Sequence, residues 1–334
     1  MIQKCVAGLL TLAVILSFVP HAAIAQDRTM PMRTADGQPD ISGIFTFRTL
    51  TPYQRPEQFE NDETLTAEAA ATFEASERTR QNRDLFDPET GARSAGYQPR
   101  AEGGVLSYNE FWYERGIDLT DDKRTSLVID PPNGRLPPRV PGVAAPEEAS
   151  EESEDERNAA RYDSYTSRSM FDRCIMGFNA GPPMSSGAYN NNVMIFQTPD
   201  HVVILNEMVH NARIIPIVDV DKPPFKQLSG VSRGHWEGDT MVIETNQFRG
   251  GESRGTSPDK SLVERFTRVN ADRIAYEYTV TDLTVYTSPF TVMMPFRRTD
   301  GPLFEYACHE GNIGMHGILA GGRELERQGR KLRP

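Results

Sequence analysis

Histidine and carboxylate side chains occur together in three short motifs of this chain, and general acid–base catalysis requires that combination. The first motif is VVILNEMVHNARIIPI, in which Glu207, His210 and Arg213 interrupt an apolar, strand-like run. On a regular strand Glu207 and His210 face opposite sides, so they converge only across a bulge or bend, for which Asn211 is a suitable place. Because a buried ionisable group must be paired, the three side chains indicate either a catalytic cluster or a structural network.

The second motif, SRGHWEGD, places Arg233 and His235 two residues apart, so that they share one face of a strand while Trp236 lies on the other. An arginine beside a histidine suits recognition of an anionic group combined with proton transfer. The alternative is an arginine that is paired with one of the many carboxylates. Residues 237–239, Glu-Gly-Asp, are typical of a tight hairpin turn.

The third motif is YACHEGN, in which Tyr306 lies on a predicted strand and His309 and Glu310 follow at its end, where functional side chains often have rigid support. Asn191 lies in a run of three asparagines, whose amides suit a sugar or a carboxylate but are also typical of a turn. We therefore predict two sets of site residues: His210, His309, Glu207 and Glu310 as catalytic, and Arg213, Arg233, His235, Asn191 and Tyr306 as substrate-binding.

Familiar catalytic and cofactor motifs are missing from the sequence. It contains no GxSxG nucleophile elbow, no P-loop and no dinucleotide-binding fingerprint, and His309-Glu310 lacks the second histidine of a zincin helix. His210, His235 and His309 are ligand types that zinc and copper accept, but they have no local ligand spacing. The sequence therefore predicts neither a metal site nor another cofactor.

The charge balance excludes one class of partner. The chain has 334 residues, with 36 Lys and Arg against 47 Asp and Glu, and a formal net charge of -11. A protein that binds nucleic acid through a basic field needs clustered Lys and Arg, so nucleic acid is not an expected partner. The expected partner is a small-molecule ligand or substrate, and the oligomeric state is left open.

Residues 1–25 have the organisation of a signal peptide, with Lys4, an apolar run from Val6 to Val19, and the small-residue cleavage pattern of residues 23–25. An uncleaved anchor is the alternative, but the run is shorter than a membrane span of roughly 20 residues. No other segment approaches that length, so no membrane span is expected after processing. The protein is therefore predicted to be periplasmic or secreted.

Two cysteines, Cys174 and Cys308, remain after that processing. Disulfides form and persist in oxidising compartments, so an even pair in an exported chain favours a bridge that closes a long loop. Two separate buried thiols are the alternative.

The N-terminal segment, residues 26–130, contains a strand and a helix. The strand is predicted at Asp40–Phe47, and the residues on its apolar face are Ile41, Phe45 and Phe47. The helix is predicted to begin at the N-cap Thr66 and to end at Asn82. Its apolar stripe consists of Leu65, Ala69 and Phe73.

The rest of the chain is predicted to be mainly β. Residues 131–160 hold six prolines followed by seven acidic residues, a composition typical of a solvated loop. The core spans residues 161–320, and a basic tail follows at 321–334. Strand-like segments occur at 193–196, 202–209, 213–218, 240–245, 262–269, 273–281, 290–296 and 304–308. Because almost no helix separates them, we predict an antiparallel β-barrel of lipocalin-like (calycin) type, with a β-sandwich as the alternative.

Several stretches resemble a family of secreted bacterial proteins that is uncharacterised. They are PDISGIF, TSLVIDPPNGRLPP, RCIMGFNAGPP, YNNNVMIFQTP, VVILNEMVHNARIIP, SRGHWEGDTMVIETNQF, LVERFTRV and FEYACHEGNIGM. In that family the position of His235 often holds Arg or another residue. The resemblance therefore favours as central residues Glu207, His210, Arg213, Arg233, His309 and Glu310. The resemblance implies no particular activity.

Two functions follow from these observations. The first is an exported lyase, hydrolase or isomerase that acts on a small carbohydrate-derived or aromatic compound. In it His210 or His309 transfers protons, a carboxylate orients the histidine, and arginines hold an anionic group. The second is a non-catalytic, lipocalin-like carrier of an apolar or aromatic ligand.

Overall fold

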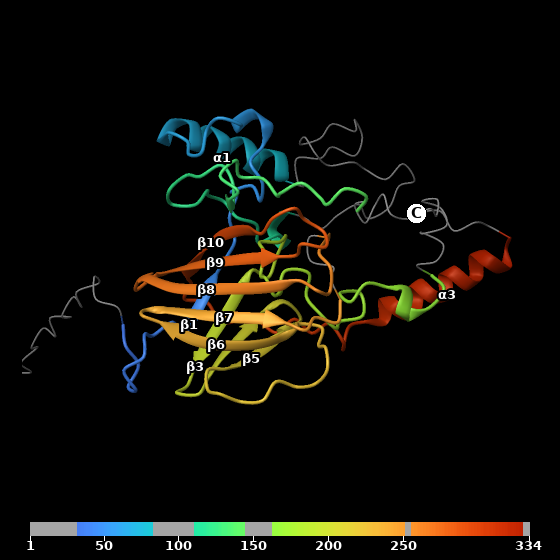
Figure 1. The fold of residues 1–334 in the computed structure, drawn as a ribbon. Coiled ribbons are helices and arrows are strands. Elements are labelled where there is room, and N and C mark those ends of the chain that lie inside the picture. Colours follow the sequence, from blue (N-terminus) through green and yellow to red (C-terminus); the bar gives the residue numbers. More distant parts are fainter. Residues whose placement is uncertain (1–31, 83–109, 144–161, 251–254, 330–334) are drawn as a thin grey trace, which may run out of the picture.

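The computed structural model describes residues 32–82, 110–143, 162–250 and 255–329 (Figure 1). The predicted signal peptide, the acidic run at 147–156 and the last residues of the basic tail lie outside the described residues.

Nine strands form one antiparallel sheet that is nearly closed into a barrel, which confirms the predicted β-barrel. The order of strands in the sheet is β5 (Ala212–Pro216), β4 (His201–Asn206), β3 (Asn192–Gln197), β1 (Gly43–Thr46), β10 (Phe290–Arg298), β9 (Arg273–Thr281), β8 (Ser261–Asn270), β7 (Thr240–Asn246) and β6 (Val231–Glu237). A tenth strand, β2 (Val128–Asp130), pairs with β10 beside this path. Figure 1 shows β6 to β10 passing in front of β1, β3 and β5, which cross behind them steeply.

The number of strands explains why the barrel is open between β5 and β6. Chain order and sheet order coincide around the barrel, and the β1–β10 pair joins its two ends. Every neighbouring pair on this path is antiparallel. An odd number of such strands leaves β5 and β6 running in the same direction, and residues 217–230 connect them. We call the gap between these two strands the seam, and no ladder between described residues crosses it.

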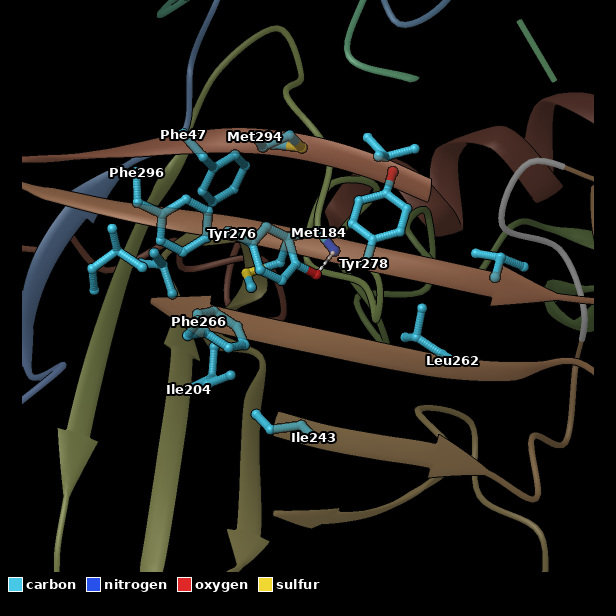
Figure 2. Packing of buried hydrophobic residues seen from close by; sticks show 14 of the residues in the cluster. Phe47, Met184, Ile204, Ile243, Leu262, Phe266, Tyr276, Tyr278, Met294 and Phe296 are labelled. Carbon is cyan, nitrogen blue, oxygen red and sulfur yellow. Dashed lines mark hydrogen bonds between the residues drawn. The ribbon is translucent and has the colours of Figure 1, made fainter. Parts of the chain in front are cut away.

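Alternate residues of the strands point into the barrel and fill it with aromatic rings (Figure 2). Phe266, Tyr276 and Phe296 lie with their ring centres 4.7 to 6.0 Å apart. The predicted inward face of the first strand is confirmed, because Ile41, Phe45 and Phe47 are fully buried. Removal of this apolar surface from water is the main stabilising contribution to the fold.

The predicted helix is confirmed as α1 (Ala67–Gln81). Its N-cap is Thr66, whose hydroxyl oxygen accepts a hydrogen bond from the backbone N–H of Ala69 at 3.2 Å. The predicted stripe was wrong at one position: Ala69 is exposed, and Ala70 is buried together with Phe73. The i, i+3 spacing of Ala70 and Phe73 puts them on one face, toward the small apolar cluster that includes Leu50 and Leu119.

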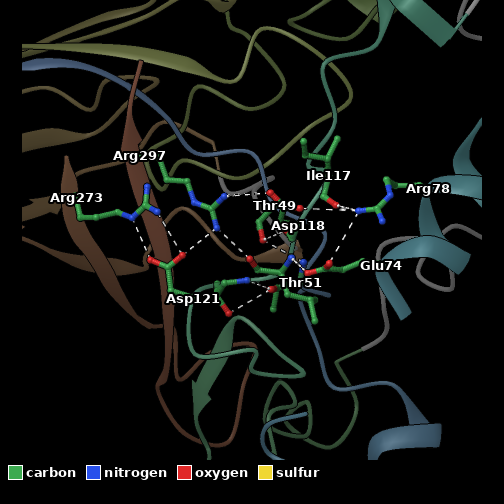
Figure 3. A network of polar contacts seen from close by, with 11 residues as sticks. Thr49, Thr51, Glu74, Arg78, Ile117, Asp118, Asp121, Arg273 and Arg297 are labelled. Carbon is green, nitrogen blue, oxygen red and sulfur yellow. Dashed lines mark hydrogen bonds and ion pairs between the residues drawn. The ribbon is translucent and has the colours of Figure 1, made fainter. Parts of the chain in front are cut away.

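A network of ion pairs joins α1 to the barrel through residues 117–121 (Figure 3). Arg78 of α1 donates to the carbonyl oxygen of Ile117 at 2.6 Å and lies 3.9 Å from Asp118. Arg297 of β10 lies 3.5 Å from Asp118 and 3.2 Å from Asp121. The N-terminal segment is therefore fixed against the β10 side of the barrel.

The C-terminal region differs from its prediction. Residues 304–308 were expected to be a strand but are irregular, because the backbone N–H of Phe304 bonds to the carboxylate of Glu207 and Cys308 is held by a bridge. A helix that the sequence analysis missed, α3 (Ile313–Arg327), follows and extends away from the barrel in Figure 1. It crosses the predicted core boundary at residue 320.

The described residues also contain four short 3-10 helices: η1 (Glu57–Phe59), η3 (Glu110–Trp112), η4 (Tyr165–Ser167) and η5 (Met208–His210). Among the described residues, no helix has the length and apolar character that crossing a membrane would need.

Candidate functional site

Glu207 lies directly after β4 and is buried. Its carboxylate accepts hydrogen bonds from the side-chain amide of Asn192 at 2.8 Å and from the backbone N–H of Phe304 at 3.1 Å. The backbone bends in η5, where Val209 and His210 have φ angles of 55° and 37°, and not at Asn211 as suggested by the sequence. The bend turns His210 out to solvent, and the His210 ring forms no hydrogen bond or ion pair with the residues that the structure describes.

Arg213 does not join Glu207 and His210, so the predicted cluster of these three side chains is wrong. Arg213 points inward from β5 and forms a bidentate ion pair with Glu264 of β8, at 2.7 and 3.0 Å. Tyr276 donates its hydroxyl hydrogen to the same carboxylate at 2.6 Å. The reason is geometric: Glu207 lies beyond the end of β4, whereas Arg213 is inside the barrel.

The pKa of Arg213 shows that this side chain keeps its charge in the ion pair with Glu264. Burial by itself lowers the pKa of Arg213, but the charge and hydrogen bonds of Glu264 outweigh burial and raise it above its usual value. Burial, and then the charge of Glu264, raise the pKa of Tyr276 well above its usual value. Arg213 therefore stays protonated, and Tyr276 remains a hydrogen-bond donor.

The second motif forms β6, and Arg233 and His235 share its outward face as predicted, while Trp236 packs against the core. His235 Nε2 lies 3.2 Å from Glu237 Oε1, and the other carboxylate oxygen of Glu237 lies 2.9 Å from Arg265. Arg265, and then His235, hold the pKa of Glu237 below its usual value. From the sequence, Glu237 was expected to be part of a turn only. It is a partner of His235, on an outer surface where both side chains are about half exposed.

The third motif is anchored by the sulfur atoms of Cys174 and Cys308, which are 2.01 Å apart, at disulfide distance as predicted. Tyr306 stacks on Tyr189 with ring centres 6.5 Å apart. His309 and Glu310 are exposed, and neither side chain forms a hydrogen bond or ion pair with another described residue. Their catalytic roles stay predictions, as does ligand contact by Tyr306.

Asn191 is fully buried and holds two loops together. Its amide nitrogen donates to the carbonyl oxygens of Glu114 at 2.8 Å and Gly187 at 3.0 Å. Its oxygen accepts from the backbone N–H of Gly187 at 2.7 Å and from Asn179 at 3.3 Å. These four bonds use the whole capacity of the amide, which leaves none for a ligand.

A cavity of about 670 Å³ lies at the seam and brings together two of the predicted site residues, Arg213 and Arg233. We call it the seam cavity. Its wall also contains two cationic side chains that the sequence analysis missed, Lys226 from the β5–β6 connection and Arg249 from the segment after β7. No aspartate or glutamate is among the described residues of the wall. A chain with a net charge of -11 thus has a locally cationic cavity.

The cations of the seam cavity differ in how they are engaged. Arg233 donates to the carbonyl oxygens of Val220, Asp221 and Ser232, which fixes the β5–β6 connection but does not neutralise its charge. Arg213 is paired with Glu264 at 2.7 Å, and the ammonium of Lys226 lies 3.4 Å from the carboxylate of Asp259. Arg249 is exposed and forms no ion pair within the described residues. Arg233 and Arg249 are therefore the cations of the described wall whose charge is not paired with a carboxylate of the described residues, and they are the ones available to an anion.

Apolar side chains form the remainder of the wall. Ile214 of β5, with Phe225 and Leu228 of the connection, are exposed apolar side chains at the cavity. An apolar wall with a few convergent polar groups is the usual form of a small-molecule site. The signal in the sequence is the connection itself, since DKPPFKQL (221–228) places lysines and a phenylalanine between two strands.

No protein-family model matches the chain, and no curated protein matches it. In the part of the chain that the structure describes, no group of three or more His, Cys, Asp or Glu side chains is placed to hold a metal ion.

Proposed function

We propose that this protein binds a small organic anion, a carboxylate on an apolar body, in the seam cavity. The observation that carries the proposal is the described part of the wall, which has four cationic and no acidic side chains, and in which Arg233 and Arg249 have no ion pair with a described residue. Guanidinium groups bind carboxylates by charge-assisted and often bidentate hydrogen bonds. Phe225, Leu228 and Ile214 provide apolar surface for the body of the ligand.

This proposal keeps one part of each sequence-based hypothesis. It keeps the arginine recognition of the enzyme hypothesis and the non-catalytic binding of the carrier hypothesis. The ligand lies at the seam instead of the barrel centre, because aromatic rings occupy the centre. We propose an extracytoplasmic location, which is supported by the predicted signal peptide and by the pairing of Cys174 with Cys308.

Titration calorimetry with hexanoate tests the proposal, with hexanol as the uncharged comparison. We expect hexanoate to bind, hexanol to bind much more weakly, and the affinity for hexanoate to fall as salt is added. Arg249→Gln is expected to raise the Kd about tenfold, the equivalent of about 1.4 kcal/mol. Arg135→Gln is the control, since Arg135 is not part of the cavity wall. Equal binding of hexanoate and hexanol, or no binding of either, would overturn the proposal.

Acid–base catalysis is a second candidate, and one observation favours it. His235 and Glu237 form a histidine–carboxylate pair on the outward face of β6 that also carries Arg233 of the seam cavity. Alternate residues of a strand are about 6.6 Å apart, so a ligand held by Arg233 can reach His235. A screen of esters and hydroxy acids tests this with His235→Ala, His210→Ala and His309→Ala. Turnover that is lost in one variant at unchanged Tm supports catalysis, and turnover in none of the proteins contradicts it.

A further inference from the structure

A second, smaller cavity lies next to the seam cavity, and Leu228 lines both. It has a volume of about 230 Å³, and we call it the apolar chamber. Its wall is rich in methionine and phenylalanine, with Met170, Phe171, Met176 and Phe248 among its residues. Methionine is unbranched and flexible, so such a wall adapts to apolar groups of different shape.

The apolar chamber is smaller than a usual site for a whole small molecule, so its size suits part of a ligand. Sites for small molecules usually have volumes of about 300 to 1,000 Å³, and the seam cavity lies in that range whereas the chamber is below it. Leu228 lies on both walls, so the two spaces are neighbours with one side chain between them.

The charges set the orientation of such a ligand. The one cation of the chamber's described wall, Lys260, is buried and already engaged: its ammonium donates to Thr256 Oγ1 at 3.0 Å and lies 4.5 Å from the centre of the Phe248 ring. Arg249 of the seam cavity has no ion pair among the described residues. The carboxylate of the ligand therefore fits the seam cavity, next to Arg249, and its apolar end fits the apolar chamber.

We propose that the ligand is an elongated monocarboxylate, with an alkyl or arylalkyl chain that passes Leu228 and ends in the apolar chamber. This inference rests on the proposed function and adds the ligand class to it. The chamber wall is held in place at one side by Cys174, which lies between Phe171 and Phe178 in the sequence and is bridged to Cys308. The rings of Phe171 and Phe178 meet edge to face, with centres 5.1 Å apart.

A chain-length series tests the proposal by titration calorimetry of the full chain with butanoate, octanoate and dodecanoate, below their micelle concentrations. Each methylene that becomes buried is expected to lower the Kd about fourfold. The affinity should therefore rise steeply with chain length. If butanoate and dodecanoate bind equally, the elongated ligand is wrong and the anion site stands, whereas if none of the three binds, the proposed function itself fails.

Two variants fill the chamber without touching the seam cavity, Met176→Trp and Met170→Trp, and Met315→Trp on α3 is the matched control. Both chamber variants are expected to bind butanoate with the affinity of the native protein. Their affinity should no longer increase with chain length, whereas that of Met315→Trp should increase as in the native protein. Two independent positions keep the test valid if one variant fails to fold. Dodecanedioate is expected to bind more weakly than dodecanoate. Tighter binding of the diacid would overturn an apolar chain end in the chamber.

Discussion

Arg213 on β5 and Glu264 on β8 form a bidentate ion pair through the barrel interior, with N–O distances of 2.7 and 3.0 Å. Tyr276 donates to the same carboxylate, and the backbone N–H of Met184 donates to the Tyr276 oxygen at 3.2 Å. Within the described part of the chain, β5 is an edge strand that pairs with β4 alone. The ion pair therefore ties the seam edge of the barrel to the opposite wall and fixes one side of the seam cavity.

Glu264→Ala is expected to destabilise the protein strongly, because it leaves the buried guanidinium of Arg213 without its counter-charge. Loss of one partner from a buried pair typically costs about 3–5 kcal/mol. The free energy of unfolding from urea denaturation measures the loss. The double variant Arg213→Met with Glu264→Leu replaces both charges by apolar groups and should recover most of it. A loss below about 1 kcal/mol in the single variant would contradict a stabilising role of the pair.

Asp282, directly after β9, gives a prediction about pH. Its carboxylate accepts from the backbone N–H of Ser257 at 2.5 Å and from the hydroxyl of Thr284 at 2.6 Å. Burial alone would raise the pKa of Asp282, but the hydrogen bonds from Thr284 and Ser257 outweigh burial and hold the pKa below its usual value. A carboxyl with a lower pKa in the folded state contributes stability above its unfolded pKa of about 3.9 and loses it as the pH falls through the folded pKa.

Asp282→Asn is therefore expected to lower the free energy of unfolding by about 1–2 kcal/mol at pH 7, since hydrogen bonds to a charged group are lost. The difference from the native protein should shrink at the acid end of the pH range, where the native carboxyl is itself protonated. Urea denaturation of both proteins at a series of pH values measures this. A difference that does not change with pH would contradict the lowered pKa.

Local patterns were sufficient to predict most of the fold. The apolar alternation of Ile41, Phe45 and Phe47 identifies a buried strand face, and Thr66 identifies the start of α1, because each signal lies within a few residues. α3 was missed because four glycines lie within its 15 residues, and glycine has a low helix propensity. The strand prediction at 304–308 was wrong because this segment is held by side chains from elsewhere in the chain, Glu207 and Cys174, and not by a neighbouring strand.

The site was predicted only in part, since contacts between distant residues assemble it. Arg213 and Arg233 were identified by their chemistry, but the partner of Arg213 lies 51 residues away on β8. The sequence contains one indication of this partner. Glu264 alternates with Leu262 and Phe266, which places it on the inward face of a strand, and a buried carboxylate requires a buried cation. The residues around Arg249 in the sequence do not predict that it lies at the seam. Its position there depends on the number of strands and on how the barrel closes.

The Cys174–Cys308 bridge is expected to contribute to stability. It closes a loop with a sequence separation of 134 residues, for which the chain-entropy model gives about 5 kcal/mol as an upper value. Serine at both positions should therefore lower the free energy of unfolding by about 3–5 kcal/mol. Guanidinium denaturation with and without dithiothreitol measures this. Native protein in reductant should match the variant, and no effect of reductant on the native protein would contradict a formed bridge.

Gly234 of β6 allows the two seam strands to approach each other just beyond the seam cavity. A Cβ at this position would lie 2.9 Å from Ile217 Cγ2, 3.1 Å from Met241 Sδ and 3.3 Å from Ile215 Cγ2. Gly234→Val therefore requires these side chains to move and is expected to cost about 1–3 kcal/mol, with a smaller cost for Gly234→Ala. Because the strands must separate, both variants should also weaken hexanoate binding.

Gly317→Ala is the control for this prediction, since a Cβ at Gly317 in α3 meets no atom within 4 Å and alanine favours the helix. It should leave the stability unchanged or raise it, and it should leave hexanoate binding unchanged. Thermal denaturation and titration calorimetry of the three variants measure both effects. If Gly234→Val keeps both the stability and the hexanoate affinity of the native protein, the close approach of β5 and β6 does not shape the seam cavity.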